Sequence, residues 1–320
     1  MPVWSHSRLG SFEKCPLAYR YRYVDRIKRD IFGVEAFMGN RVHEALEFLY
    51  QEVGKKRVPK VDAVVAHYHA RWAAEYRADK VRIVRRGLHA DDYRATGEEC
   101  VRHYYAEETP FDQAETLGLE AKFQFALDPN GRYAVMGFID RLARPAPGIY
   151  EVHDYKTGAS VPRESDLRSD RQLSLYQMAV RERYPDATEV RLVWHYLALR
   201  ERRVMSRTEA ELEAHRKQAI RLIDTIEAAR DYPARESALC RWCEYRDICP
   251  TQQGALLIER AEAEAAEKAM RGDRPTDAPA GPATQMSLLG GGAPAGGASA
   301  GPTRPRPVPP PRGRPSHPAE

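Results

Sequence analysis

Residues 150–158, Y-E-V-H-D-Y-K-T-G, form the stretch on which the fold prediction for this 320-residue chain depends. The segment is strand-like, and side chains alternate between the two faces of a strand. Asp154 and Lys156 therefore project from one face, and His153 and Tyr155 from the other. A carboxylate beside an ammonium group suits metal-assisted phosphodiester hydrolysis, in which the acid holds a divalent cation and the lysine orients water or stabilises charge on phosphate. Solvated strands often carry the same triplet, so the neighbouring segments decide its meaning.

Two more strand-like segments precede this one. Residues 117–125 alternate apolar and polar side chains, and residues 133–139 lead directly into Asp140. Between them lies an Asn-Gly pair, which supplies the positive φ values of a tight hairpin turn. The acids at positions 140 and 154 then lie near the ends of neighbouring strands, where one metal ion can bridge them.

Helical patterns surround these strands. Gln172 and Tyr176 are four residues apart and share one helix face, and an upstream helix carries His43. The sequence thus predicts a mixed α/β (α+β) fold in which a central mixed sheet is flanked by helices. The expected helices span residues 38–53, 60–79, 90–108, 164–183, 208–230 and 255–271, and a further strand spans 190–197.

Four blocks occur in a fixed order: M-G-N-R-V-H-E-A-L, G-F-I-D-R-L, H-D-Y-K-T-G and Q-L-S-L-Y-Q. In these blocks the chain resembles the RecB-like branch of the PD-(D/E)XK nuclease superfamily, which includes the nuclease domains of RecB and AddB and the CRISPR-associated RecB-like exonucleases. The resemblance covers about residues 5–250. It implies a restriction-endonuclease-like core with a helical N-terminal insertion. Ile139 replaces the proline of the superfamily name, and this branch tolerates an apolar residue there.

The resemblance also implies roles for individual residues. By motif position, the metal ligands are His43, Asp140, Asp154 and the backbone carbonyl of Tyr155; the catalytic lysine is Lys156; and Gln172 and Tyr176 support the site and the nucleic acid. A single histidine on an amphipathic helix is more often a packing residue, but two acids nearby favour a ligand. Three alternatives stay open. Glu120 is either a fourth acidic group or an exposed strand residue, Arg141 either neutralises a phosphate or pairs with an acid, and Tyr176 either stacks or is core.

Cysteines give a second signal. Cys240, Cys243 and Cys249 form C-x2-C-x5-C, and Cys15 lies more than two hundred residues upstream. Four thiolates suit zinc or an iron–sulfur cluster, and the spacing alone leaves both open. The resemblance implies a [4Fe–4S] cluster, which would staple the two ends of the domain with about 4–5 kcal/mol if it acts like a covalent crosslink. We expect no disulfides, because nothing marks the chain for export. Cys100 is expected in the core or as an unpaired thiol.

Composition favours an intracellular enzyme, and we expect a cytoplasmic location. The hydrophobic fraction of 42% supports a core, no stretch is apolar enough to cross a membrane, and no signal peptide is evident. The net charge of +4 indicates nucleic acid only weakly. Local basic groups suit single-stranded nucleic acid or are solvated faces. These groups are Arg20, Arg22, Arg26, Lys28 and Arg29 interleaved with Tyr19, Tyr21 and Tyr23; Arg82, Arg85 and Arg86; and Arg200, Arg202 and Arg203.

The expected organisation has three parts. A nuclease domain spans residues 1–253, with a helical part at about 1–110, an α/β core at 115–206, and a last helix and cysteine cluster at 207–250. A helical extension spans 254–271, and a Pro/Gly/Ala/Arg-rich tail at 272–320 is expected to be disordered. Within the tail, Q-M-S-L-L at 285–289 resembles the peptide by which bacterial DNA-processing proteins bind the sliding clamp. Gln285, Leu288 and Leu289 would make that contact, unless the apolar cluster occurs by chance.

Together, the motifs and the resemblance predict a Mg²⁺- or Mn²⁺-dependent deoxyribonuclease. The expected activity is that of a single-strand exonuclease in DNA repair or recombination. The alternatives are a non-catalytic DNA-binding, iron–sulfur subunit of a recombination or CRISPR-adaptation complex, and a redox sensor without nuclease activity. The sequence contains no G-x-x-x-x-G-K-[ST] loop, so any helicase partner is expected to be a separate chain.

Overall fold

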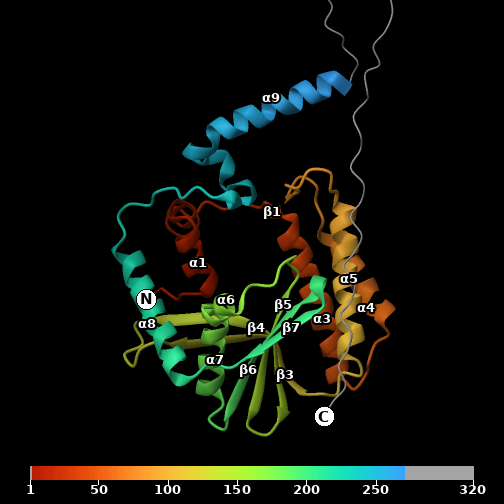
Figure 1. Ribbon diagram of the computed structural model, residues 1–320, viewed down its shortest axis with the longest axis vertical. Coiled ribbons are helices and arrows are strands. Elements are labelled where there is room, and N and C mark those ends of the chain that lie inside the picture. Colours follow the sequence, from red (N-terminus) through yellow and green to blue (C-terminus); the bar gives the residue numbers. More distant parts are fainter. Residues whose placement is uncertain (1, 271–320) are drawn as a thin grey trace, which may run out of the picture. The chain divides into compact units, whose positions relative to one another are not determined.

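The computed structural model describes residues 2–270 (Figure 1). The chain divides into two compact units, Met1–Ala265 and Ala266–Glu320, and the sheet and the candidate site lie in the first. The predicted docking residues Gln285, Leu288 and Leu289 lie outside the described residues. Within residues 2–270, no helix combines the length and the apolar character needed to span a bilayer.

A five-stranded mixed sheet forms the centre of the first unit. Strand order is β3-β4-β5-β6-β7; β5 and β6 are parallel, and the other neighbours are antiparallel. Helices cover both faces, so the predicted mixed α/β fold class is confirmed. The strands are β3 (Glu115–Ala126), β4 (Ala134–Ala146), β5 (Ile149–Lys156), β6 (Glu189–Tyr196) and β7 (Glu201–Met205).

The parallel pair β5 and β6 needs a long connection, because a tight turn cannot join parallel strands. Two helices supply it, α6 (Glu164–Arg168) and α7 (Arg171–Arg183), where the sequence predicted one helix over 164–183. Asp170 separates them because its backbone is extended, and its side chain accepts the N–H of Leu173 as an N-cap. Strand β7 was not predicted, because E-R-R-V-M has few apolar residues.

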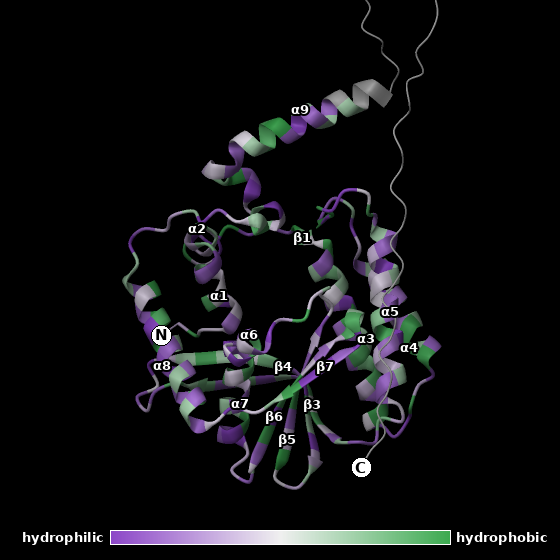
Figure 2. Ribbon diagram, in the orientation of Figure 1, coloured by the Kyte–Doolittle hydropathy of each residue, from purple (hydrophilic) through white to green (hydrophobic). Residues whose placement is uncertain are grey.

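Helices α3 (Val34–Gly54), α4 (Val61–Glu75) and α5 (Ala90–Glu108) cover one face, which we call the α3 face (Figure 1). Each buries an apolar stripe and exposes polar residues, as amphipathic helices do (Figure 2). The three helices fall within the predicted helical part, with ends that differ by a few residues. Two-residue strands β1 (Phe32–Gly33) and β2 (Val81–Arg82) pair beside them.

The opposite face, the α7 face, packs against α7, α8 (Glu209–Ala228) and α1 (His6–Lys14). The chain start is fastened to the sheet, because Trp4 exchanges two backbone hydrogen bonds with β4 at 2.7 and 2.8 Å. Short elements complete the chain: α2 (Pro16–Tyr19), a π-helical turn (Arg20–Val24), 3-10 turns at Leu197–Leu199, Ala238–Trp242, Arg246–Ile248 and Pro250–Gln252, and α9 (Gln253–Met270).

Candidate active site

The predicted site residues gather where β4 separates from β5. Pairing between these strands reaches Arg141 opposite His153 and goes no further, whereas β5 stays paired with β6 to its last residue, Lys156. The backbone N–H of Tyr155 faces the resulting gap. Asp140 Oδ2 accepts it at 2.8 Å, so a side chain replaces the missing strand partner. The separation of the strands therefore places the Asp140 carboxylate beside the end of β5.

His43 reaches the same place from α3. Its Nε2 lies 3.0 Å from the carbonyl oxygen of Tyr155, and its Nδ1 lies 3.6 Å from Asp140 Oδ2. The helix can approach so closely because residue 39 is glycine; a Cβ there would lie 3.1 Å from Thr157 Oγ1. The imidazole, the carboxylate and the carbonyl predicted as ligands thus lie within a few ångströms of one another.

Glu120 joins this group, although the sequence left its role open. His43, Glu120 and Asp140 each offer a ligand atom, and these atoms lie within 4.8 Å of one another. Glu120 is exposed as a residue, but partial burial of its carboxyl and the nearby Asp140 charge raise the pKa of that group. The register explains the encounter, because Leu119 pairs with Arg141, and the next position, Glu120, faces Asp140. The hairpin turn fixes that register, so the pair could have been found from the sequence.

Asp154 is not a member of that trio. Its side chain is 2% exposed, and its Oδ2 lies 2.7 Å from Lys156 Nζ. Within the described part of the chain, Oδ2 has no partner in hydrogen-bond geometry. Complete burial raises the Asp154 pKa to about 6, against the opposing effect of Lys156. Burial would lower the pKa of Lys156, but the neighbouring acids, Asp154 first, raise it, so the lysine is an ammonium group.

The donor set matches a hard divalent cation. Carboxylate oxygens, a carbonyl oxygen and one imidazole suit Mg²⁺ or Mn²⁺. Asp154 Oδ2 lies 2.7 Å from the Lys156 ammonium group, so this buried carboxylate is already ion-paired, and a metal ion at this place would share it with the lysine. His43, Glu120 and Asp140 therefore fit such an ion, and Asp154 lies within electrostatic reach of Asp140 and His43.

Gln172 and Tyr176 lie on α7, and Gln172 Nε2 donates to Tyr176 Oη at 2.9 Å. Tyr176 is mostly buried and packs edge-on against Phe123, at 5.2 Å between ring centroids. A Cβ on Gly137 would lie 2.6 Å from the Phe123 ring and 3.1 Å from Tyr176. The glycine of G-F-I-D is thus required by ring packing, and Tyr176 combines a core position with a polar contact to Gln172.

Contacts with other elements fix the position of α7. Arg171 forms a two-pronged ion pair with Glu13 of α1 at 2.7 and 3.1 Å. Ser174 Oγ lies 2.6 Å from Nδ1 of His215 on α8. Each of these contacts joins α7 to a distant segment, so the helix that carries Gln172 is held from two sides.

Arg141 points to the α3 face. The residue is 3% exposed, and its guanidinium donates to the hydroxyls of Tyr50 and Tyr104. Tyr104 in turn lies 3.2 Å from the Tyr155 hydroxyl. Neither alternative proposed from the sequence describes these contacts, since Arg141 faces tyrosines rather than an acid or a phosphate site.

The four predicted cluster cysteines are free and half-buried. Backbone N–H groups point at two of the sulfurs, Arg235 to Cys15 and Ser237 to Cys240, each at 3.4 Å. Burial raises the pKa of Cys243, and Cys15, Cys249 and Cys240 add to the effect, so all three lie within electrostatic reach of Cys243. The chain start and the C-terminal segment therefore meet at these sulfurs.

The fifth cysteine, Cys100, is separate from this group. It is fully buried in the core formed by α3, α4 and α5, and burial raises its pKa to about 12.

Many of the basic side chains proposed to contact nucleic acid are occupied by neighbouring acids or carbonyls. Arg22 with Glu244 and Arg29 with Asp247 join the chain start to the cysteine segment. They stabilise this junction and are less available to phosphate than the sequence indicated. The other contacts are Arg20 with Asp25, Arg85 with Glu35, Arg86 with Glu262, Arg203 with Glu201, and Arg82 with the Cys243 carbonyl.

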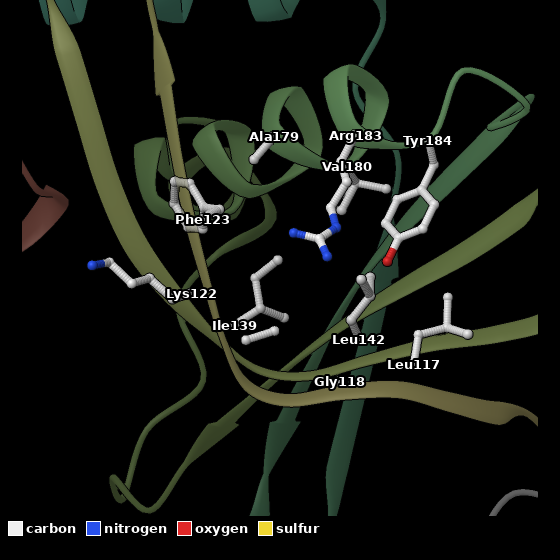
Figure 3. A pocket seen from close by; sticks show the side chains of 11 residues that line it. Leu117, Gly118, Lys122, Phe123, Ile139, Leu142, Ala179, Val180, Arg183 and Tyr184 are labelled. Carbon is white, nitrogen blue, oxygen red and sulfur yellow. The ribbon is translucent and has the colours of Figure 1, made fainter.

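A hollow of about 190 Å³ lies between α7 and strands β3 and β4 (Figure 3). Its walls are mainly apolar, including Phe123, Ile139, Leu142 and Val180, and Arg183 extends over it from α7. None of the predicted metal ligands lines it. This hollow is therefore distinct from the candidate metal site, although Ile139 directly precedes Asp140.

Residues 3–250 match the PD-(D/E)XK nuclease superfamily, and this chain belongs to that superfamily. Two solved structures are similar. The crystal structure of SSO0001 has 15% identity and a TM-score of 0.38, over 78% of this chain and 86% of that one. A protein from Eubacterium rectale described as a "Putative exonuclease" has 12% identity and a TM-score of 0.43, over 87% and 91%. No curated protein matches this chain.

Proposed function

We propose that this nuclease belongs to the RecB-like branch and degrades single-stranded DNA from an end, in DNA repair or recombination, with Mg²⁺ or Mn²⁺ as cofactor. One observation carries the proposal: His43, Asp140 and the Tyr155 carbonyl surround the gap between β4 and β5, beside the buried Asp154–Lys156 pair. DNA is the substrate and partner, and a helicase would be supplied by a separate chain.

His43, Asp140, Asp154 and the Tyr155 carbonyl would hold the metal, with Glu120 as an added carboxylate. Bound there, it would supply positive charge at the scissile phosphate and lower the pKa of a water molecule. Lys156 carries its own positive charge next to Asp154, where it orients that water or stabilises developing negative charge. The Gln172–Tyr176 pair supports the same face from α7.

Cleavage of end-labelled oligonucleotides tests this proposal. The purified chain is incubated with single-stranded and duplex DNA, labelled at the 5′ or the 3′ end, with Mn²⁺, Mg²⁺ or EDTA. We expect metal-dependent, stepwise shortening of the single strand. DNA binding without products in any metal would favour the alternative, a non-catalytic DNA-binding subunit of a recombination or CRISPR-adaptation complex. DNA affinity that depends on the redox state, without cleavage products, would favour the other alternative, a redox sensor without nuclease activity.

We also propose that Cys15, Cys240, Cys243 and Cys249 hold a [4Fe–4S] cluster. Support comes from the N–H groups directed at two of the sulfurs, a common feature around iron–sulfur clusters. A cluster there would join the chain start to the segment after α8.

Anaerobic purification tests this assignment. Wild type should be brown, with about four iron and four sulfide per chain. Cys243→Ser should be colourless and less soluble, whereas the control Cys100→Ala, in a core without the other cysteines, should keep the iron. Zinc in place of iron in the wild type would overturn the cluster assignment and leave the nuclease proposal intact.

A last proposal concerns the segment outside the described residues. A peptide spanning 284–290, with Gln285, Leu288 and Leu289, would bind a bacterial sliding clamp. Titration of the labelled peptide with purified clamp measures the affinity, and the control carries alanine at positions 285, 288 and 289. No affinity for the natural peptide would end this proposal.

A further inference from the structure

The β3–β4 hairpin continues past the candidate metal site, and an exposed pair of side chains follows on it. Glu120 lies opposite Asp140 in this hairpin, and two residues further along each strand Lys122 lies opposite Phe138. Two residues of a strand span about 7 Å. The pair of Lys122 and Phe138 therefore lies one step beyond the group in which His43 meets the two acids.

Burial fixes the direction in which these two side chains point. Their neighbours along the strands, Phe123 and Ile139, pack with residues of α7. Because consecutive side chains of a strand point to opposite faces, Lys122 and Phe138 point away from α7. That is the side from which α3 brings His43 to the metal group. Although Lys122 borders the apolar hollow under α7, Figure 3 shows its ammonium end directed away from it.

Both side chains are accessible to a ligand. Phe138 is 47% exposed, and Lys122 is exposed as well. Among residues 2–270, Lys122 forms no ion pair or side-chain hydrogen bond, and Phe138 packs against no other aromatic ring. The other cations of the hairpin are occupied: Arg132 by Asp224 and Glu227, Arg144 by Glu115, and Arg141 by two tyrosine hydroxyls. Within the described part of the chain, the hairpin thus leaves a cation and an aromatic ring uncovered beside the metal site.

An ammonium group beside an exposed ring suits single-stranded DNA. The ammonium group attracts a phosphate, and a base can stack on the ring. A single exposed apolar side chain is common on protein surfaces and needs no explanation by itself. Here, however, the ring lies opposite an unpaired lysine and one step from the metal group, where the strand next to the scissile phosphate would lie.

We propose that Phe138 stacks on the base of the nucleotide next to the scissile phosphate, and that Lys122 contacts the phosphate that follows. This inference rests on the proposed nuclease function and names the surface that would hold the DNA strand. Every base has a face that can stack, so the contact does not depend on base identity, as the degradation of DNA of any sequence requires.

Fluorescence anisotropy with a labelled single-stranded oligomer in EDTA, where no cleavage interferes, tests the contact. Phe138→Ala should weaken binding by about tenfold, as for one base stacked on an aromatic ring, and Phe138→Trp should restore it. Phe32→Ala is the matched control, because Phe32 is also 47% exposed but lies on β1, outside the main sheet, and this variant should bind like wild type.

Salt dependence tests the lysine in the same assay. Lys122→Ala should reduce the slope of the logarithm of the binding constant against the logarithm of salt concentration by about 0.7, as for one phosphate contact on a single strand. Lys217→Ala, at the exposed lysine of α8, should keep the wild-type slope. An unchanged slope in Lys122→Ala would refute the phosphate contact.

An abasic nucleotide, placed at each position of the oligomer in turn, gives a measurement that also works on wild type alone. At one position the missing base should weaken wild-type binding by about tenfold, and the same oligomer should show no such loss with Phe138→Ala. If that loss persists in Phe138→Ala, or if Phe138→Ala binds like wild type, the stacking contact is refuted, and cleavage with Mn²⁺ would leave the nuclease proposal standing. Binding that depends on Phe138, without cleavage in any metal, would support the surface and refute the nuclease proposal.

Discussion

The two faces of β5 bury polar groups in different ways. On the α7 face, Asp154 is buried, and within residues 2–270 its ion-pair partner is Lys156, whose Nζ lies 2.7 Å from Oδ2. On the α3 face, Arg141 donates to tyrosine hydroxyls, and His153 and His195 share a 2.9 Å hydrogen bond. His153 and Asp154, which are consecutive on β5, therefore face different surroundings: a histidine ring for the first and an ammonium group for the second.

The difference distinguishes polar groups that are placed to bind a ligand from polar groups that hold the fold together. A buried carboxylate that is only partly satisfied is unfavourable until something binds it. On the α3 face, the Arg141 guanidinium lies between two tyrosine hydroxyls and His153 bonds to His195, although Arg141 Nε and His153 Nε2 have no hydrogen-bond partner within residues 2–270. We infer that the gap between β4 and β5, where His43 from α3 meets Asp140 beside the Asp154–Lys156 pair, is prepared for a cation and substrate. The tyrosine contacts of the α3 face hold Tyr155, whose carbonyl faces that gap, in position.

The largest effect on the cleavage rate is expected from replacing Lys156, on the α7 face. Lys156→Ala should lower cleavage by about 10³-fold, since a positive charge at the phosphate is lost. The measurement is the rate of product formation with Mn²⁺ on labelled single-stranded DNA. Lys217→Ala, an exposed lysine of α8 paired with Glu213, is the matched control and should cleave normally.

A double variant sharpens this result. Lys156→Ala leaves Asp154 buried without a cation, so it should also lower the free energy of unfolding, by about 1–3 kcal/mol. Adding Asp154→Asn removes the charge and should restore most of that stability in EDTA, without restoring cleavage. Full activity in Lys156→Ala would show that the lysine assignment is wrong.

The next largest effect, on stability, is expected from replacing Arg141, on the α3 face. Arg141→Met should lower the free energy of unfolding by about 2 kcal/mol, because Tyr50 and Tyr104 lose a buried donor. Cleavage per folded molecule should change less than about threefold, since Arg141 is not directed at the site. Urea unfolding and cleavage assays check both values.

The control for this variant lies on the same strand. Arg144→Met, at an exposed arginine paired with Glu115, should change stability by less than about 0.5 kcal/mol. If Arg141→Met abolished cleavage at unchanged stability, the inference that Arg141 stabilises the fold without taking part in cleavage would be wrong.

The sequence predicted most of the sheet, because alternation marks β3, an Asn-Gly turn joins β3 to β4, and the segments of β5 and β6 are strand-like. It missed β7, whose residues 201–205 are mostly polar. That strand forms through pairing with β6 rather than through its own apolar pattern. It also merged α6 with α7, since the break depends on the backbone of Asp170.

The candidate site was predictable where motif residues share an element, as Asp154 and Lys156 do on β5. The sequence does not indicate that β4 separates from β5. This separation allows the backbone N–H of Tyr155 to donate to Asp140. The contacts of the Arg141 side chain could not be predicted either. It depends on Tyr50 and Tyr104, which come from two helices distant in the chain.

A smaller effect, on metal affinity, is expected from replacing Glu120 in the candidate metal site. Glu120→Gln should weaken Mn²⁺ binding by about tenfold, because one carboxylate of the group loses its charge. Titration followed by the electron paramagnetic resonance of free Mn²⁺ gives the affinity without any cleavage. Glu115→Gln, at the exposed start of β3, is the control. Equal affinity in Glu120→Gln and wild type would exclude Glu120 as a ligand.

The smallest effect concerns pH and the α3 face. Burial lowers the pKa of both His153 and His195 well below the usual range. Arg141 and Arg202 act in the same direction on both rings, and Glu151 opposes them at His195. The unfolded chain, with ordinary histidine pKa values of about 6.5, then binds more protons than the folded one. This stabilisation is fully present above about pH 6.5 and is lost as the pH falls below it.

His153→Asn tests this sign, because an amide can keep the bond to His195 but does not titrate. Between pH 7.5 and 5.5 in EDTA, wild type should lose about 1 kcal/mol more unfolding free energy than the variant. Asp154 and Glu108, whose pKa values are raised by burial, gain stability on acidification instead. They are present in both proteins, so their effect cancels in the difference. An equal acid response in His153→Asn and wild type would mean that the pair is not buried in its neutral form.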